Sequence, residues 1–144
     1  MKGMVNQHNM WRKKVGVPPL TWSDELATFA RQWADELARK GCEMAHRPRS
    51  GEFIQKYGEN IYWCQGMSAT PQGVVDSWAS ELEFFNIKTL ECEKGKVCGH
   101  YTQVVWSSTQ QVGCAMTKCG DQEIWVCNYN PPGNWVGQKP YPKK

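Results

Sequence analysis

Seven cysteines in 144 residues restrict the fold of this chain more than any other feature of its sequence. No C-x-x-C pair occurs, which weakens a zinc-ribbon or thioredoxin-like interpretation. Such a density in a small domain is typical of a disulfide framework formed in an oxidising compartment. We therefore expect a secreted, extracellular protein. Residues 1–7 have one basic side chain and no apolar core, so we interpret the chain as a mature domain without a signal peptide.

The cysteine spacing favours particular pairs without fixing them. Cys114 and Cys127 are equidistant from Gly120-Asp121, which separates two strand-like segments, so a hairpin centred there would bring them together. Cys92 and Cys98 close a short loop and form a second natural pair. This leaves Cys119 for Cys42, but six cysteines allow many connectivities. The three expected bridges are Cys42–Cys119, Cys92–Cys98 and Cys114–Cys127, with Cys64 left free or available for an intermolecular disulfide in an otherwise monomeric protein.

Charge and hydropathy exclude two classes of function. The net charge is +3 and the basic residues form no stripe, which argues against a nucleic-acid partner. The densest basic run, residues 46–49, is expected to be a solvated loop. No apolar run is long enough to span a bilayer. Eight tryptophans indicate either a heavily aromatic core or a groove that accepts apolar ligands.

Periodicity predicts three helices, at residues 4–15, from Thr21 or Ser23 to about Lys40, and from residue 70 to about 85. His8 lies in the first helix without an evident partner and is interpreted as structural. In the third helix, Glu81 falls at the edge of the apolar face, where a carboxylate is costly unless it is paired. Glu81 therefore needs a partner from elsewhere in the chain.

Residues 98–106 combine a cysteine, a glycine, a histidine and a run of β-branched and aromatic side chains. The run from Thr102 to Trp106 predicts a strand. Gly99 would then turn the chain and hold His100 at the edge of the sheet. His100 is either a packed core histidine or half of a site.

Several segments in order resemble the CAP superfamily, most closely its plant pathogenesis-related protein 1 branch. They are Gly99-His100-Tyr101-Thr102-Gln103-Val104-Val105-Trp106, Cys127-Asn128-Tyr129-Asn130-Pro131-Pro132-Gly133-Asn134, His8-Asn9, Val17-Pro18-Pro19-Leu20-Thr21-Trp22 and Gly58-Glu59-Asn60. The resemblance covers essentially the whole chain. It implies a single α+β domain over residues 1–144, a three-layer α/β/α sandwich with a small antiparallel sheet between helices. It also implies the same three cysteine pairs.

The resemblance places a cleft tetrad of two histidines and two glutamates on His46, Glu59, Glu81 and His100. This gives Glu81 its partners. Imidazole nitrogens and carboxylate oxygens suit Zn²⁺ or another divalent cation, with His46 and His100 as the nitrogen ligands, and no metal is required. Arg47 stands where members often have serine, and its charge would weaken cation binding if it points inward.

The family resemblance implies a pathogenesis-related defence protein that binds a sterol or another apolar lipid, is antimicrobial by sequestering sterols, and has a membrane surface as a further partner. Candidate lipid contacts are Tyr62, Trp63 and Met67, because a glycine-bearing loop before a helix can open a groove and methionine adapts to varied ligands. We expect no catalysis, because the matched motifs contain no evident nucleophile. The alternative is a metal-dependent hydrolase or protease, with a glutamate as general base on metal-bound water.

A further alternative concerns the Pro/Gly-rich tail, residues 131–144. Its segment from Pro131 to Tyr141 matches a peptide that plant members release as a defence signal. The chain continues for three residues beyond this pattern, a departure that weakens the match to the processed form. The plain interpretation is a tail that lies over the sheet.

Overall fold

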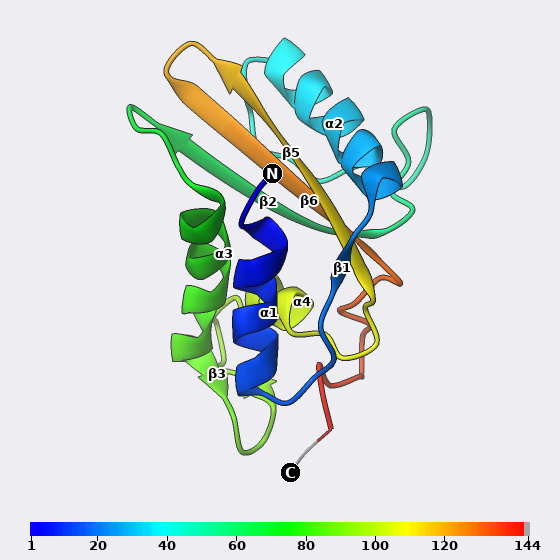
Figure 1. Ribbon diagram of the computed structural model, residues 1–144, viewed down its shortest axis with the longest axis vertical. Helices are drawn as coiled ribbons and strands as arrows, with labels where there is room; N and C mark the ends of the chain where they lie inside the picture. Colours follow the sequence, from blue (N-terminus) through cyan, green and yellow to red (C-terminus); the bar gives the residue numbers. More distant parts are fainter. Residues whose placement is uncertain (143–144) are drawn as a thin grey trace.

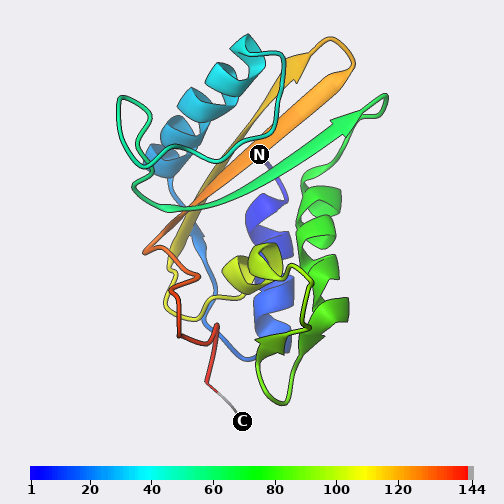
Figure 2. The same cartoon turned by 180° about the vertical axis from the view of Figure 1, so that it is seen from behind.

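The computed structural model describes residues 1–142 and shows a sheet between two helical layers (Figure 1). Its strand order is β1-β5-β6-β2, and every pairing is antiparallel except the short parallel contact of β1 with β5. One helix, α2, covers one face, and α1, α3 and α4 cover the other (Figures 1 and 2). The α/β/α sandwich expected from the sequence is confirmed. None of the described helices is long and apolar enough to cross a membrane.

The helices and strands follow one another along the chain from α1 to β6. They are α1 (Met4–Lys14), β1 (Thr21–Trp22), α2 (Asp24–Arg39), β2 (Gly58–Gln65), α3 (Pro71–Ala79), the 3₁₀ helix η1 (Ser80–Phe84), β3 (Phe85–Asn86), β4 (Glu91–Cys92), α4 (Gly99–Val104), β5 (Gln111–Cys119) and β6 (Gln122–Asn130). The strands β3 and β4 form a separate two-stranded sheet. Lys143 and Lys144, the end of the expected tail, lie outside the described residues.

The central strand β6 shows why the sheet needs helices on both faces. Its side chains alternate between two cores, as the period of a strand requires. Ile124 and Val126 pack with α2, whereas Trp125 and Tyr129 pack with the layer of α1, α3 and α4. Residues 123–129 of β6 are all buried, as expected of a strand covered on both faces, although Glu123 and Asn128 among them are polar.

The starts of α2 and α3 match the sequence prediction. Ser23 caps α2 by accepting a hydrogen bond from Leu26 N at 3.1 Å, and Gly41 ends the helix with a positive φ of 85°. Thr70 caps α3 in the same way through Gly73 N at 3.0 Å, with Pro71 in the first turn. Side chains that satisfy the free amides set these helix starts.

Two predicted elements are wrong. The third helix stops at Ala79 and tightens into η1, because Phe85 then pairs with Cys92 as a strand. The predicted strand Thr102–Trp106 instead belongs to the helix α4 and the turn after it. Since neighbouring β-branched residues disfavour a helix only weakly, tertiary contacts decide the outcome.

One of these contacts is made by Arg12, whose side chain is buried between α1 and the end of α4. Its Nη1 donates to Val104 O at 3.0 Å and to Trp106 O at 2.8 Å, and its Nη2 donates to Thr109 O at 3.1 Å. Burial lowers the pKa of this guanidinium to about 10, which leaves it charged at neutral pH. A cation at the C-terminus of a helix also interacts favourably with the helix dipole.

All three expected disulfides are present, with Cα–Cα distances of 6.0 Å for Cys42–Cys119, 5.8 Å for Cys92–Cys98 and 4.1 Å for Cys114–Cys127. The last joins directly opposed residues of β5 and β6, as the hairpin predicts. Cys64 is free and buried, and burial raises the pKa of its thiol. An intermolecular disulfide at Cys64 therefore requires local opening.

His8 has the structural role expected of it. It is fully buried, its Nδ1 lies 2.8 Å from Met4 O, and its Nε2 lies 2.8 Å from the hydroxyl of Tyr129 on β6. Burial lowers the pKa of this imidazole from 6.5 to about 4, so the folded protein holds it neutral. The contact ties α1 to the sheet.

We predict that His8 makes the protein less stable in acid. The folded pKa lies below the unfolded value, so the unfolded chain binds the proton first and stability is lost as the pH falls from about 6.5 to about 4. The full loss from this group is about 3 kcal/mol. Urea unfolding across this pH range measures it, with His8→Gln as the comparison. A His8→Gln variant that keeps the same pH slope over this interval would contradict the prediction.

Candidate functional site

One half of the predicted tetrad is a hydrogen-bonded pair between the loop after α2 and the start of β2. His46 Nδ1 lies 2.9 Å from Glu59 Oε1, and the carboxylate side chain is fully buried. This bond raises the pKa of His46. The imidazole itself is half-exposed, so its other nitrogen, Nε2, remains available to solvent or a ligand.

The Glu59 carboxylate is also contacted by Arg47. Arg47 N donates to Glu59 Oε1 at 3.0 Å, and its Nε lies 3.8 Å from Oε2. The guanidinium packs 3.6 Å above the ring of Phe29 and is almost fully buried. The expectation of a wholly solvated loop at residues 46–49 is therefore wrong for Arg47, because an ion pair, an aromatic contact and two backbone carbonyls offset the cost of its burial. Its inward charge opposes binding of a cation beside Glu59.

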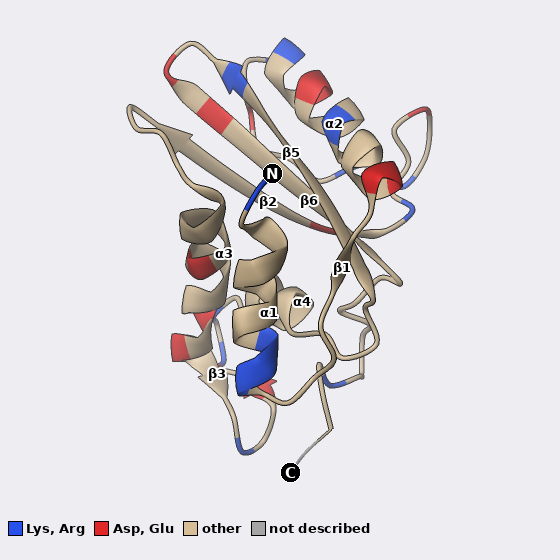
Figure 3. Ribbon diagram, viewed as in Figure 1, with Lys and Arg blue, Asp and Glu red and all other residues tan. Residues whose placement is uncertain are grey.

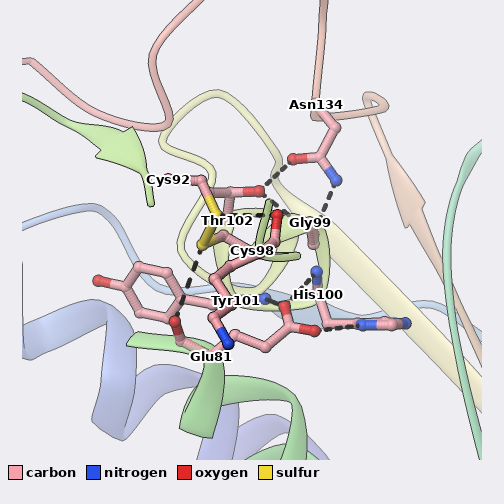
Figure 4. Close-up of a disulfide and its surroundings, with 9 residues drawn as sticks. Glu81, Cys92, Cys98, Gly99, His100, Tyr101, Thr102 and Asn134 are labelled. Carbon is pink, nitrogen blue, oxygen red and sulfur yellow. Dashed lines mark hydrogen bonds and ion pairs between the residues drawn. A yellow bond between two sulfur atoms is a disulfide. The ribbon is translucent and has the colours of Figure 1, made fainter. Parts of the chain in front are cut away.

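The other half of the tetrad joins η1 to the start of α4 (Figure 4). Glu81 Oε2 lies 2.8 Å from His100 Nδ1, and Oε1 accepts from the backbone amides of His100 at 2.8 Å and Tyr101 at 3.0 Å. A carboxylate that accepts the first amides of a helix stabilises its N-terminus. These are the partners that the sequence required for Glu81.

The two halves are linked through β2. Asn60, next to Glu59, donates from Nδ2 to His100 O at 3.1 Å and to the hydroxyl of Tyr129 at 3.3 Å. Trp78 of α3 stacks parallel to the imidazole of His100, with ring centroids 6.4 Å apart. The structure thus arranges the four residues as two hydrogen-bonded pairs that are linked through Asn60.

This arrangement resembles the outer part of a metal site more than a complete one. Each glutamate holds Nδ1 of its histidine, which orients the ring and leaves Nε2 for a ligand. Among residues 1–142, however, no three His, Cys, Asp or Glu side chains are placed to hold one ion. The described residues thus supply two imidazoles, each oriented by a carboxylate, but no complete set of metal ligands.

The three predicted lipid contacts lie at the other end of β2. Trp63 is 39 % exposed and donates to Gln122 Oε1 at 2.9 Å, Met67 is 56 % exposed, and Tyr62 packs partly against the core. The hollow beside Met67 is lined mainly by glycines and polar side chains. Buried Glu123 fixes this loop by accepting from Ala69 N at 3.0 Å. Trp63 and Met67 are thus exposed apolar side chains, but the hollow beside Met67 is mainly polar.

A more apolar cavity lies at the opposite end of the molecule, between the end of α1 and the β3–β4 hairpin. We refer to it as the apolar groove, and its volume is about 470 Å³. It is lined by Lys14, Val15, Leu82, Ile87, Lys88, Leu90, Tyr101 and Tyr141. The hydroxyls of the two tyrosines lie 3.4 Å apart, and burial raises the pKa of Tyr101, so that phenol is neutral.

Sequence patterns did not reveal the apolar groove. Its walls come from α1, η1, the β3–β4 hairpin, α4 and the tail, which are far apart in the chain. The nearest signals were Leu82 on the apolar face of the third helix and Tyr101 in the Gly99–Trp106 segment. Neither indicates a cavity until the segments are placed in space.

Comparison with known proteins identifies the family of the chain. The sequence profile of the Cysteine-rich secretory protein family (CAP) matches residues 5–129. A pathogenesis-related protein of PR-1 type from Sambucus nigra is 44 % identical, with 95 % of this chain and 79 % of the relative covered. Pathogenesis-related protein PRMS of Zea mays is also 44 % identical, with 95 % and 80 % covered.

Solved structures give the same fold. Venom allergen-like protein 4 of Schistosoma mansoni aligns with a TM-score of 0.72 at 28 % identity, over 99 % of this chain and 94 % of that one. The structure of NaASP2 with Zn²⁺ aligns with a TM-score of 0.79 at 26 % identity, over 98 % and 84 %. With the matched profile, the plant relatives and the shared fold, the chain belongs to the CAP (Cysteine-rich secretory protein) family.

Proposed function

We propose that this protein is a secreted defence protein of the pathogenesis-related type that binds a sterol or another apolar lipid without turning it over. The names of its plant relatives and of its family support the defence role and secretion. Three disulfides agree with an oxidising compartment. The apolar groove is the single observation that carries the lipid-binding part.

The lining of the apolar groove suits a rigid lipid with one polar end. Aliphatic side chains from separate segments, among them Val15, Leu82 and Ile87, form its walls. The phenols of Tyr101 and Tyr141, whose hydroxyls lie 3.4 Å apart, supply polar groups of the lining besides Lys14 and Lys88. Ligand sites of this kind combine apolar walls with a few polar groups that fix orientation.

Variants of two exposed apolar residues can distinguish lipid binding in the apolar groove from lipid binding at the loop of Tyr62, Trp63 and Met67. Ile87 borders the apolar groove and is 66 % exposed, and Met67 lies in the loop at 56 % exposure. An aspartate at either position should leave the fold intact, because neither side chain is part of the core. Each variant then tests one location.

We predict saturable binding of radiolabelled cholesterol by the wild-type protein, weakened about tenfold or more in Ile87→Asp and unchanged in Met67→Asp. The loss follows from placing a charge on the apolar wall that the lipid covers. The reverse pattern would place the site in the loop and contradict the apolar groove. An absence of saturable binding would contradict lipid binding altogether.

If the protein is a hydrolase, we expect the opposite result from the same samples: substrate turnover and no sterol binding. Turnover of peptide or ester substrates that a chelator or Glu59→Gln abolishes, with no binding of sterol, would replace our proposal with the hydrolase alternative. Lipid binding that survives chelation and His100→Ala supports ours, because the apolar groove shares no residue with the tetrad.

We also expect added Zn²⁺ to bind through the free Nε2 atoms of His46 and His100. NaASP2, which shares the fold, was crystallised with Zn²⁺, and this supports the proposal. Calorimetric titration at neutral pH should give a signal that disappears in a His46→Ala, His100→Ala double variant. Binding should weaken as the pH falls, because Glu59 raises the pKa of His46 and protonation removes a ligand. A signal that persists in the double variant, or none in the wild-type protein, would contradict this assignment.

A further inference from the structure

We propose a second binding site, for an anionic oligosaccharide that carries carboxylates, in a groove between the loop before β2 and the start of the tail. We refer to it as the tail groove, and its volume is about 530 Å³. Figure 2 shows the two segments at the same end of the sheet. The tail groove is lined by Arg49, Gln55, Lys56, Tyr57, Gly58, Glu59, Gln103, Pro132, Gly133, Asn134, Trp135 and Val136. None of these residues lines the apolar groove, so this proposal does not depend on the proposed function.

The main reason is an exposed tryptophan that is held rigidly. Trp135 is 55 % exposed, yet its Nε1 donates to Pro132 O at 3.0 Å, which fixes the indole over its own loop. The C–H face of a sugar ring stacks on such an exposed indole. Because the indole is already ordered, binding loses little side-chain entropy.

The loop beneath the indole is equally fixed. Asn134 has a positive φ of 57°, and its side chain donates to Gly99 O at 2.8 Å and accepts from Thr102 Oγ1 at 2.6 Å (Figure 4). Gly133 N donates to Gln103 Oε1 at 3.1 Å. A Cβ at Gly133 would lie 2.7 Å from the Trp106 ring, so this backbone rests directly on the core. A platform anchored on α4 cannot fold away from a ligand.

The charge of the tail groove selects an anion. Arg49 and Lys56 are exposed, and neither forms an ion pair with any residue in 1–142. The carboxylate of Glu59 does not offset them, because its side chain is fully buried and engaged by His46 and Arg47. Lys and Arg side chains are spread over the whole molecule (Figure 3). Arg49 and Lys56 differ from the others in that they line the tail groove. A guanidinium binds a carboxylate with two parallel hydrogen bonds.

The shape favours an extended polymer over a compact head group. Asn134 and Trp135 also line a second hollow, of about 340 Å³, together with Lys96 and Gln138. A chain that extends from one hollow into the other therefore meets amide and cationic side chains in both. Repeated sugar rings with carboxylates match this alternation of aromatic, amide and cation better than a peptide does.

The test uses calorimetry with a short de-esterified galacturonan oligomer and with its methyl ester, which has the same sugar rings but no charge. The Arg49→Ala, Lys56→Ala variant should bind the free acid about tenfold more weakly. A Lys2→Ala, Lys13→Ala variant removes the same charge from exposed positions outside the tail groove and should bind normally. Trp135→Ala should weaken binding of both oligomers, and Trp63→Ala, which removes another exposed indole, should not.

Each other outcome overturns the proposal. Equal losses in the two double variants would show that only net charge matters. Binding of polyglutamate with the same dependence on Arg49, Lys56 and Trp135 would assign the groove to an acidic protein segment instead. No binding of the free acid by the wild-type protein would remove the site.

Discussion

The short helix α4 exists because two buried or half-buried charges hold its ends. Glu81 accepts the amides of His100 and Tyr101 at the N-terminus, and Arg12 donates to Val104 O at the C-terminus. Each charge has the sign that the helix dipole favours at that end. A helix of six residues does not form by itself in water, so these two side chains, from η1 and α1, determine its place.

Three proposed sites depend on α4. His100 takes its orientation from Glu81, Tyr101 lines the apolar groove, and Gln103 accepts the amide of Gly133 and so fixes the tail groove. The sheet supplies the rigid support, since Tyr129 of β6 bonds to His8 of α1 and to Asn60 of β2. The three proposals share one scaffold: Glu59 belongs to both the tetrad and the tail groove, whereas the apolar groove shares no residue with either.

The sequence predicts what depends on local pattern. Helix α2 follows from its apolar stripe and its Ser23 and Gly41 boundaries, and the β5–β6 hairpin follows from its turn and from Cys114 and Cys127. The family resemblance implies the four tetrad residues, and the apolar face of the third helix requires a partner for Glu81, but the pairs Glu59–His46 and Glu81–His100 are seen only in the structure. The helix and the hairpin need no knowledge of distant contacts.

The features that could not be predicted from the sequence depend on contacts between residues far apart in the chain. The segment from Thr102 to Trp106 has the composition of a strand. Glu81 at the N-terminus of α4 and Arg12 at its C-terminus are among the distant contacts that favour a helix and a turn there instead. Arg47 has the sequence context of a solvated loop, yet Phe29 and Glu59, from other elements, bury it. The two grooves are assembled from segments whose order along the chain gives no sign of their proximity.

Amide hydrogen exchange of α4 tests the central claim most directly. Glu81→Ala removes the acceptor of the His100 and Tyr101 amides, whereas Glu83→Ala removes an exposed carboxylate from the same short helix, η1, and serves as the control. We predict that exchange across residues 99–104 accelerates about tenfold or more in Glu81→Ala, with β6 amides and the Glu83→Ala variant unchanged. Unchanged protection of α4 in Glu81→Ala would contradict the account.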